Sequence, residues 1–443
     1  MNCWTSYSSK FAWLPVFVLL VLPWGCTGKN AQLSGDLPEG AGQLNEGISE
    51  DMLIAFLPLE NLSSGNAPME EIYAALGDGL SRKGFRLLDR ERLEEFRKKY
   101  RMRYIGGTDS FLAEAMREEL GTDAVLITSL EAYQEAEPPQ ISLISRLVSC
   151  GPEPEIIWID SIGLSGDESP GFLDLKRIWE SGKLLEKAVD KLAGSLADHF
   201  HPAAGDEPFF SIPESWKTDK PGTLMSPRYR LNMKYLPYDY FRSPLIDPDR
   251  QYAIAVLPML DLAVRKKAGI IAQLHFVREL FNLTDFKVLE PGLVRDGLLR
   301  IRAVMPQGPS LAETDLITSQ GFLGVDLVLS GRVFDYQNTS FNPKVDFSMQ
   351  IIEKTSRRVV FGARVFKTGL ERVYFFNFGR VYTAHKLLQE MARVNVQLLT
   401  NSFGRWEAPE EFIALQPPWK RDDRNLLDPE PVPVGGVWDA IFF

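Results

Sequence analysis

The sequence predicts an α/β protein made of two tandem mixed-sheet domains, each with helices packed on its sheet. Two observations lead to this prediction. The chain of 443 residues repeats itself at a distance of about 200 residues, and each copy alternates strand and helix patterns before it ends in a hairpin and a long helix. A repeat of this length is typical of two copies of one domain rather than of a solenoid.

The repeat is clearest at the first expected strand of each copy. Residues 54–62 read IAFLPLENL and residues 254–262 read IAVLPMLDL, with five identical positions out of nine. The correspondence continues between GFRLLDRERL and DFKVLEPGLV. It continues again between ELGTDAVLITSLEAYQ, which ends at Gln134, and FLGVDLVLSGRVFDYQ, which ends at Gln337. The two copies are therefore expected to share one order of elements.

The first copy begins with an apolar run of buried-strand length, MLIAFLPL, at residues 52–59. A helix is expected after Pro68, because Ile72, Leu76 and Leu80 recur every four residues on one face. Further strands are expected at residues 85–88 and 124–132, and in a hairpin formed by residues 141–149 and 156–162. Further helices are expected at residues 90–101, 110–120 and 173–200.

The second copy follows the same order. Strands are expected at residues 252–259, 286–290, 325–336, 345–353 and 358–366. Helices are expected at residues 266–281 and 382–399, with a third that starts at the capping box of Ser310 and Glu313 and ends near Gly321. Parallel strands joined by helices and followed by an antiparallel pair predict a mixed sheet covered by helices.

The N-terminus carries the pattern of an export signal. Residues 11–22 form the apolar run FAWLPVFVLLVL, which Lys10 precedes. This run is too short for a comfortable membrane span and has the flanks of a signal peptide. The signal peptide is expected to occupy residues 1–25.

Cys26 is the predicted lipidation site. A small residue, Gly25, stands directly before it, as in the lipobox of bacterial lipoproteins, while Pro23 and Trp24 depart from that pattern. A plain secretory signal and an uncleaved anchor are the alternatives. An acylated Cys26 would hold the chain on a membrane by lipid, and no later segment has the 18 consecutive apolar residues of a spanning helix.

Composition shifts mark the other expected boundaries. Residues 26–50 are rich in Gly, Asn, Gln, Ser and acidic residues, as a flexible tether is. The two domains are expected at residues 51–200 and 251–402. The linker at residues 201–250 and the tail at residues 403–443 combine Pro with aromatic residues, so they should lack regular structure yet pack on or between the domains.

Charge and cysteine content exclude some classes of protein. The net charge of −10 argues against a general nucleic-acid binder. Of the three Cys residues, Cys3 would leave with the signal peptide and Cys26 would carry lipid, so Cys150 would have no disulfide partner. No P-loop, serine-hydrolase motif or zinc-ligand spacing stands out, and no metal, cofactor or catalytic residue is expected.

Three short motifs carry a resemblance to a known group of proteins. They are IAFLP at residues 54–58, LGTD at 120–123 and LGVD at 323–326. With the order of strands and helices, they resemble a bacterial envelope superfamily that includes the curli-secretion lipoprotein CsgG, the penicillin-binding-protein activator LpoB, the TolB N-terminal domain and the repeated domains of the flagellar protein FlgT. The resemblance covers about residues 50–200 and 250–400.

The resemblance implies where the protein works and how. Thr27 rather than Asp follows Cys26, which in these lipoproteins indicates the periplasmic face of the outer membrane. Members of the superfamily have no catalytic residues and act by binding other envelope proteins or by assembling into rings. The expected partners are therefore envelope proteins, the membrane through the N-terminal lipid, and further copies of the chain in a homo-oligomer.

Glu60, Asn61 and Asp261 form the candidate binding edge. They follow the first strands of the two copies, and open α/β sheets often bind ligands at the carboxyl ends of their strands. Asp123 and Asp326 occupy equivalent positions after Gly121 and Gly324. These four residues are expected to shape a turn, with the Asp side chain bonded to the backbone rather than acting as a catalyst or metal ligand.

These observations favour a non-catalytic, lipid-anchored periplasmic adaptor or assembly factor for a cell-envelope complex. The alternative is an oligomeric outer-membrane secretion component of the curli-transport type. Pore-forming members insert long amphipathic hairpins, whereas the expected turns at residues 135–140 and 151–155 are short. A third hypothesis, an unrecognised hydrolase or ligand-binding protein, would place a polar pocket beside Glu60 or Asp261.

Overall fold

The computed structural model describes residues 52–168, 177–201, 231–247, 250–300, 323–339, 341–373 and 379–400. All of them belong to one compact unit. We call residues 52–201 the first half and residues 231–400 the second half. Each half is built on a mixed sheet, so the predicted α/β class is confirmed.

The first sheet has the strand order β3-β1-β4-β5-β6, and β2 pairs with β4. Strand β1 is parallel to both neighbours, while β4, β5 and β6 form an antiparallel meander. The strands are β1 (Leu53–Phe56), β2 (Glu60–Asn61), β3 (Arg86–Leu87), β4 (Ala124–Gln134), β5 (Gln140–Ser149) and β6 (Ile156–Ser165).

The second sheet repeats this order as β10-β8-β11-β12-β13 and adds β7 at its edge. Strand β7 lies inside the segment expected to be a linker, and it pairs antiparallel with β13, whose backbone groups it satisfies. The strands are β7 (Asp239–Arg242), β8 (Ala253–Val256), β9 (Leu260–Asp261), β10 (Lys287–Val288), β11 (Leu327–Gln337), β12 (Lys344–Glu353) and β13 (Arg358–Thr368).

Two helices of the first half begin at a capping aspartate. Asp89 accepts hydrogen bonds from two backbone N–H groups at the start of α2, and Asp109 accepts one at the start of α3. The helices are α1 (Met69–Arg82), α2 (Arg90–Lys99), α3 (Ser110–Ala115, continued by a π turn to Leu120), α4 (Ser181–Phe200), α5 (Ala268–Leu283), α6 (Pro291–Arg300) and α8 (Ala384–Thr400).

The closing helix of the first half starts later than the sequence predicts. It was expected from residue 173, but α4 begins at Ser181. The N–H of Ile178 donates to the carbonyl of Gly166, in the loop after β6, and this bond holds residue 178 outside the helix. The expected capping box of Ser310 and Glu313 lies outside the described residues.

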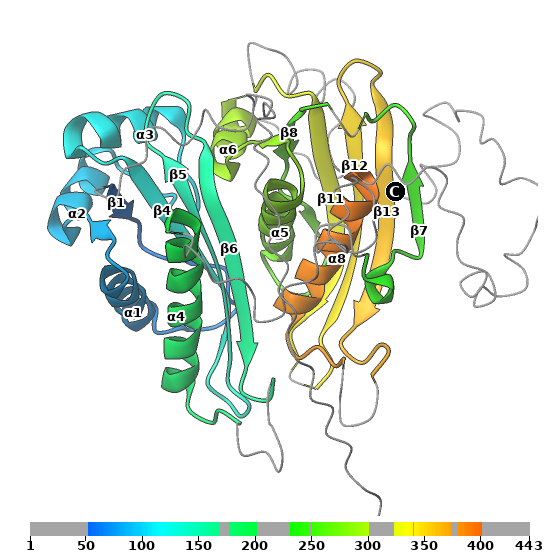
Figure 1. The fold of residues 1–443 in the computed structure, drawn as a ribbon, viewed down its shortest axis with the longest axis horizontal. Coiled ribbons are helices and arrows are strands. Elements are labelled where there is room, and N and C mark those ends of the chain that lie inside the picture. The colour runs from blue at the N-terminus through cyan, green and yellow to red at the C-terminus, as the bar shows by residue number, and fades with distance from the viewer. Residues whose placement is uncertain are drawn as a thin grey trace, which may run out of the picture. The chain divides into compact units, whose positions relative to one another are not determined.

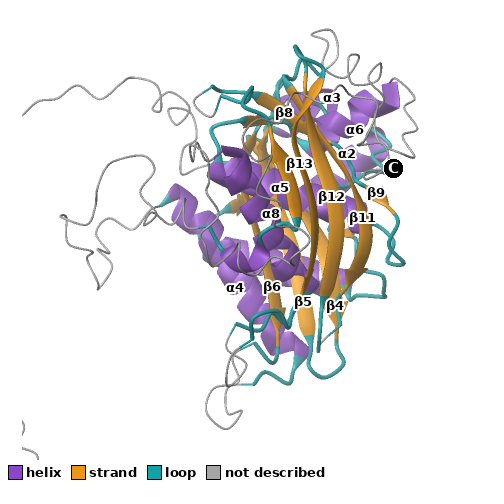
Figure 2. Ribbon diagram, turned by 90° about the vertical axis from the view of Figure 1, so that its right-hand side faces the viewer, coloured by secondary structure: helices purple, strands orange, loops and turns teal. Residues whose placement is uncertain are grey.

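Helices and sheets alternate in four layers (Figure 1). Helices α1 and α4 cover one face of the first sheet, and α5 and α8 lie between the two sheets. Figure 2 shows the long strands of both sheets running in similar directions. One hydrophobic cluster accordingly contains Val125 and Ile144 of the first sheet together with Leu274 of α5, Leu388 of α8 and Phe347 of the second sheet.

Burial differs between the two helix layers. Helix α1 buries four of its 14 residues and α4 six of 20, which is the single apolar face of a surface helix. Helix α5 buries eleven of 16 and α8 twelve of 17, because each meets a sheet on both sides. Within the described residues, no helix is both long and apolar enough to cross a membrane.

Candidate binding site

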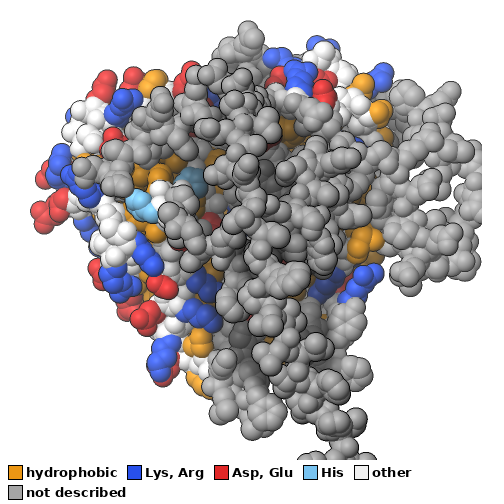
Figure 3. All heavy atoms as spheres, in the orientation of Figure 1, with side chains coloured by type: hydrophobic (Ala, Val, Ile, Leu, Met, Phe, Trp, Pro, Cys, Tyr) orange, Lys and Arg blue, Asp and Glu red, His pale blue; other side chains and the backbone are white. Residues whose placement is uncertain are grey.

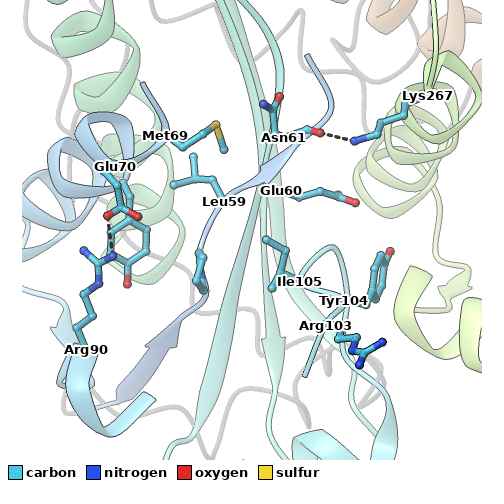
Figure 4. Close-up of a pocket in the computed structure, with 12 residues that line it drawn as sticks. Leu59, Glu60, Asn61, Met69, Glu70, Arg90, Arg103, Tyr104, Ile105 and Lys267 are labelled. Atoms are coloured by element: carbon cyan, nitrogen blue, oxygen red, sulfur yellow. Dashed lines mark hydrogen bonds and ion pairs between the residues drawn. The ribbon is translucent and has the colours of Figure 1, made fainter. Parts of the chain in front are cut away.

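A surface pocket lies where the sequence predicts a binding edge. It has a volume of about 450 Å³ and opens at the carboxyl end of β1 (Figure 4). The lining combines an apolar part with charged side chains from both halves of the molecule. Its residues are Pro58, Leu59, Glu60, Asn61, Met69, Glu70, Tyr73, Arg90, Arg103, Tyr104, Ile105 and Lys267.

Glu60 is held in place inside this pocket. Ser129 of β4 donates to its carboxylate at 2.8 Å. Its carboxylate also lies so close to Gly106 that a Cβ there would come within 2.3 Å of it, so a side chain at position 106 would displace Glu60. In Figure 4, Glu60 points to the side of the pocket where Tyr104 and Lys267 lie.

Asn61 connects the two halves. Its side-chain oxygen accepts hydrogen bonds from the backbone N–H and the hydroxyl of Ser63, which fixes the turn after β2. Its backbone carbonyl accepts a 2.6 Å hydrogen bond from Lys267 of the second half. The pocket is therefore a property of the joined halves rather than of the first half alone.

Asp261, the third residue of the predicted edge, does not line the pocket. Its carboxylate accepts a hydrogen bond from the N–H of Ala268 at 3.2 Å and so caps the start of α5. The structure thus places Glu60 and Asn61 in the pocket. Asp261, which matches Asn61 in the second half, caps a helix instead.

The charges of the pocket are mixed. Arg90 and Glu70, which are both exposed, form an ion pair at 2.6 Å. The guanidinium of Arg90 also lies over the ring of Tyr73. Arg103 forms no ion pair among the described residues. A pocket of this kind suits a protein side chain or backbone with both polar and apolar groups better than it suits a compact phosphate.

Tyr104 links the pocket to the junction between the halves. Its hydroxyl donates to the carbonyl of Gly106 at 2.9 Å, and the guanidinium of Arg295 lies 4.0 Å from its ring centre. Burial raises the pKa of the Tyr104 phenol, and the nearby Glu60 carboxylate raises it further. Tyr104 therefore stays a neutral hydrogen-bond donor at physiological pH.

Arg146 and Glu290 form a buried ion pair across the junction. Arg146 of β5 is 1% exposed and Glu290, just before α6, is 0% exposed. Both contacts of the bidentate pair measure 3.1 Å, and Arg146 also donates to the carbonyl of Gly106 at 2.6 Å. Burial would lower the pKa of Arg146, but Glu290 outweighs it and raises that pKa, so the charge persists.

Two further contacts hold the same junction. Glu290 accepts the backbone N–H of Thr108, and Gly107 meets Gly292 so closely that a Cβ on Gly107 would lie 2.7 Å from the Gly292 backbone. The loop that lines the pocket is thus fixed from the second half.

A second polar cluster is buried between the first sheet and helices α5 and α8. It consists of Glu131 of β4, His275 of α5 and His385 of α8. Burial by itself would raise the pKa of the Glu131 carboxyl, but the two histidines outweigh it and hold that pKa below its ordinary value. Burial lowers the pKa of His275. Nearby, Arg278 of α5 pairs with Asp160 of β6 at 2.6 Å.

Sequence reasoning missed this cluster because its members are far apart in the chain. His275 is 144 positions and His385 is 254 positions from Glu131. One signal was present. Helix α5 reads AGIIAQLHFVRELFNL, and its polar residues Gln273, His275 and Glu279 lie within an almost continuous apolar run. A helix without a polar face is buried on all sides, so its polar side chains must find partners inside.

The expected turn residues are found at the start of β4 and before β11. Gly121 and Gly324 have left-handed φ values of 68° and 65°, which glycine adopts without strain. Asp123 accepts the N–H of Leu53 at 2.8 Å, and Asp326 accepts that of Ala253 at 3.0 Å. Each aspartate thus bonds to the first strand of its sheet, a longer-range contact than a local turn.

Two of the three basic residues that end α2 contact acids. Arg97 contacts Glu94, and Lys99 contacts Glu119 at 2.7 Å. On the face seen in Figure 3, Lys and Arg side chains are interspersed with Asp and Glu. Cys26 lies outside the described residues, and Cys150 is a buried free thiol.

Comparison with known proteins identifies no family. No protein-family model and no curated protein matches the chain. Among solved structures, the chain is similar to the PelC dodecamer from Paraburkholderia phytofirmans, with 15% identity over 37% of this chain and 96% of that one and a TM-score of 0.25. It is also similar to lipoprotein GNA1162 from Neisseria meningitidis, with 23% identity over 32% and 98% and a TM-score of 0.23.

The LpoB C-terminal domain from Salmonella enterica is a third similar structure. It has 19% identity over 27% of this chain and 86% of that one, with a TM-score of 0.23. Each of the three matches therefore spans most of the solved chain and about a third of this one.

Proposed function

We propose that this chain is a non-catalytic, lipid-anchored periplasmic adaptor that binds an envelope protein at the pocket around Glu60 and Asn61. The observation that carries the proposal is the pocket itself, which both halves build at the edge of the first sheet. The N-terminal signal and Cys26 supply the location and the membrane anchor.

The junction supports an adaptor role because it makes the pocket rigid. Gly106 accepts hydrogen bonds from both Tyr104 and Arg146, so the loop that lines the pocket is fixed by a buried ion pair. A preformed surface binds a partner with a smaller loss of conformational entropy. The buried charged groups stabilise the junction, and the pocket charges remain at the surface for a partner.

Site-specific crosslinking in the native envelope tests the proposal. A photoreactive amino acid replaces Arg103 in the full lipidated chain, and a matched control carries it at Lys187 on the exposed side of α4. We expect one adduct of defined mass from position 103 and none from position 187. Glu60→Arg in the same chain should reduce that adduct at least tenfold. Equal labelling from both positions, or no effect of Glu60→Arg, would contradict the proposal.

A further inference from the structure

Glu131, His275 and His385 converge on one point from three separate elements. Glu131 is the extra residue of a β-bulge in β4, where the pairing with β5 passes from Leu130 to Ala132. A bulge turns a side chain out of the regular alternation. The two histidines come from the facing sides of α5 and α8, and their ring centres lie 4.6 Å apart.

The atoms of this cluster have the spacing of a ligand set. Glu131 Oε1 lies 3.1 Å from His275 Nε2, and Glu131 Oε2 contacts His385 Nδ1. One donor atom from each residue lies within 4.8 Å of the other two. Bonds of about 2.0–2.2 Å to Zn²⁺ place neighbouring ligand atoms about 3.4 Å apart in a tetrahedron. Small side-chain rotations would bring all three donors to that spacing.

The environment also favours a cation. The three side chains are 0–1% exposed, so water does not solvate the carboxylate. Arg265 donates to the backbone carbonyl of Glu131 and not to its side chain. The outer nitrogens, His275 Nδ1 and His385 Nε2, have no hydrogen-bond partner among the described residues. The inner nitrogen of each ring, His275 Nε2 and His385 Nδ1, faces the Glu131 carboxylate.

We propose that Glu131, His275 and His385 bind one divalent transition-metal ion, with Zn²⁺ the best match to two imidazoles and a carboxylate. The ion joins the first sheet to α5 and α8, and its burial makes the site structural. Since the donors come from both halves, the ion binds as the halves pack together and exchanges slowly afterwards. This proposal is independent of the adaptor function.

Metal content of the untagged full-length chain tests it. The protein is produced with added Zn²⁺, dialysed against a chelator and analysed by elemental mass spectrometry. We expect one Zn²⁺ per chain, released when urea unfolds the protein. Refolding with Co²⁺ should give the visible absorption of a tetrahedral site, in which a water or buffer anion takes the fourth position beside the three protein ligands. X-ray absorption of the zinc-loaded wild type should show two imidazole ligands, a result that needs no variant.

The four histidines of the chain provide matched variants. His275→Gln with His385→Gln should lose the ion, whereas His199→Gln with His201→Gln, at the end of α4, should keep it. Three results would each overturn the proposal. The first is loss of the ion in the His199 and His201 variant but not in the His275 and His385 variant. The others are fewer than about 0.2 ions per wild-type chain and an X-ray absorption spectrum without imidazole ligands. In those cases the cluster is a direct carboxylate–histidine contact only.

Discussion

The helix layers of the two halves occupy the same place in the same topology, but their surroundings differ. Helices α1 and α4 pack on one sheet and keep a polar outer face, whereas α5 and α8 pack between two sheets. The pattern of apolar and polar residues in each helix layer depends on what the layer packs against, and not on its place in the topology. The two halves share one strand order, and the junction decides which helix faces are apolar.

The two sheets differ in the complementary way. Gly163 of β6 gives His385 room, since a Cβ there would lie 2.5 Å from the imidazole ring. The counterpart of Gly163 in the second sheet is Phe366. Gly163 pairs with Ser142 of β5, and Phe366 pairs with Asp346 at the same point of β12. Phe366 is 36% exposed. A small residue thus marks the sheet face that accepts a helix, and a large one stands on the face that does not.

The largest expected effect comes from breaking the ion pair at the junction. Arg146→Ala leaves the Glu290 carboxylate buried without its partner, so the free energy of unfolding should fall by about 3–5 kcal/mol. Urea denaturation followed by circular dichroism measures the change. The matched exposed pair is Arg90 with Glu70, where Arg90→Ala should cost less than about 1 kcal/mol.

A double variant separates charge from packing at this site. Arg146→Met combined with Glu290→Met removes both buried charges, and it should recover most of the stability that Arg146→Ala loses. If Arg146→Ala costs no more than Arg90→Ala, the junction does not depend on the buried pair.

The second effect tests the contrast between the sheet faces. Gly163→Ala forces His385 and α8 to shift, and it should cost about 1–3 kcal/mol. Phe366→Ala at the corresponding position of the second sheet should cost less than about 1 kcal/mol, because that side chain is partly exposed. Thermal unfolding of both variants measures the difference. Equal losses would show that the two faces are packed alike.

The third effect tests where the two halves should behave the same. Asp123→Ala and Asp326→Ala each remove one side-chain hydrogen bond to the first strand of a sheet. Each should lower the free energy of unfolding by about 1 kcal/mol. Denaturant titrations of the two variants should agree within about 0.5 kcal/mol, and a larger gap would mean that the shared turn is not equivalent in the two halves.

The last comparison changes reactivity rather than stability and concerns a thiol. The N–H of Cys150 bonds to the carbonyl of Asp123, and that of Lys354 bonds in the same way to Asp326. Burial raises the pKa of the Cys150 thiol to about 11 from 9.0. At pH 8 the thiolate fraction is then about 100-fold lower than in the unfolded chain, and labelling should slow at least as much.

The measurement is the rate of disulfide exchange with a chromogenic reagent. A chain that starts at Ser49 contains Cys150 as its only thiol. Cysteine introduced as Lys354→Cys in a Cys150→Ser background should react at a normal rate, because position 354 is partly exposed. Fast labelling of native Cys150 would remove this difference between the halves.

Much of the fold could be predicted from the sequence because its signals are local. Apolar runs locate the long strands, and Gly121 and Gly324 mark the left-handed turns before them. Long-range pairing leaves no such signal. The start of α4, the edge strand β7 and the meeting of Glu131 with His385 depend on segments that are distant in sequence.

The candidate site divides in the same way. Glu60 and Asn61 could be placed at a strand end from periodicity alone, and they do line the pocket. Lys267 could not be assigned to that pocket, since its contact with Asn61 spans 206 positions. The task of Asp261 as a helix cap was also hidden, because its acceptor role depends on where α5 begins.

The buried position of α5 and α8 has a consequence for how the protein is made. A chain that emerges N-terminus first presents Val125, Ile127 and Ile144 on an apolar sheet face before residues 268–400 exist. Until those residues arrive, the first half has an incomplete core and is open to association with other chains. If the expected export signal acts, crossing the membrane unfolded, with folding only after the last helix has crossed, would avoid that exposure.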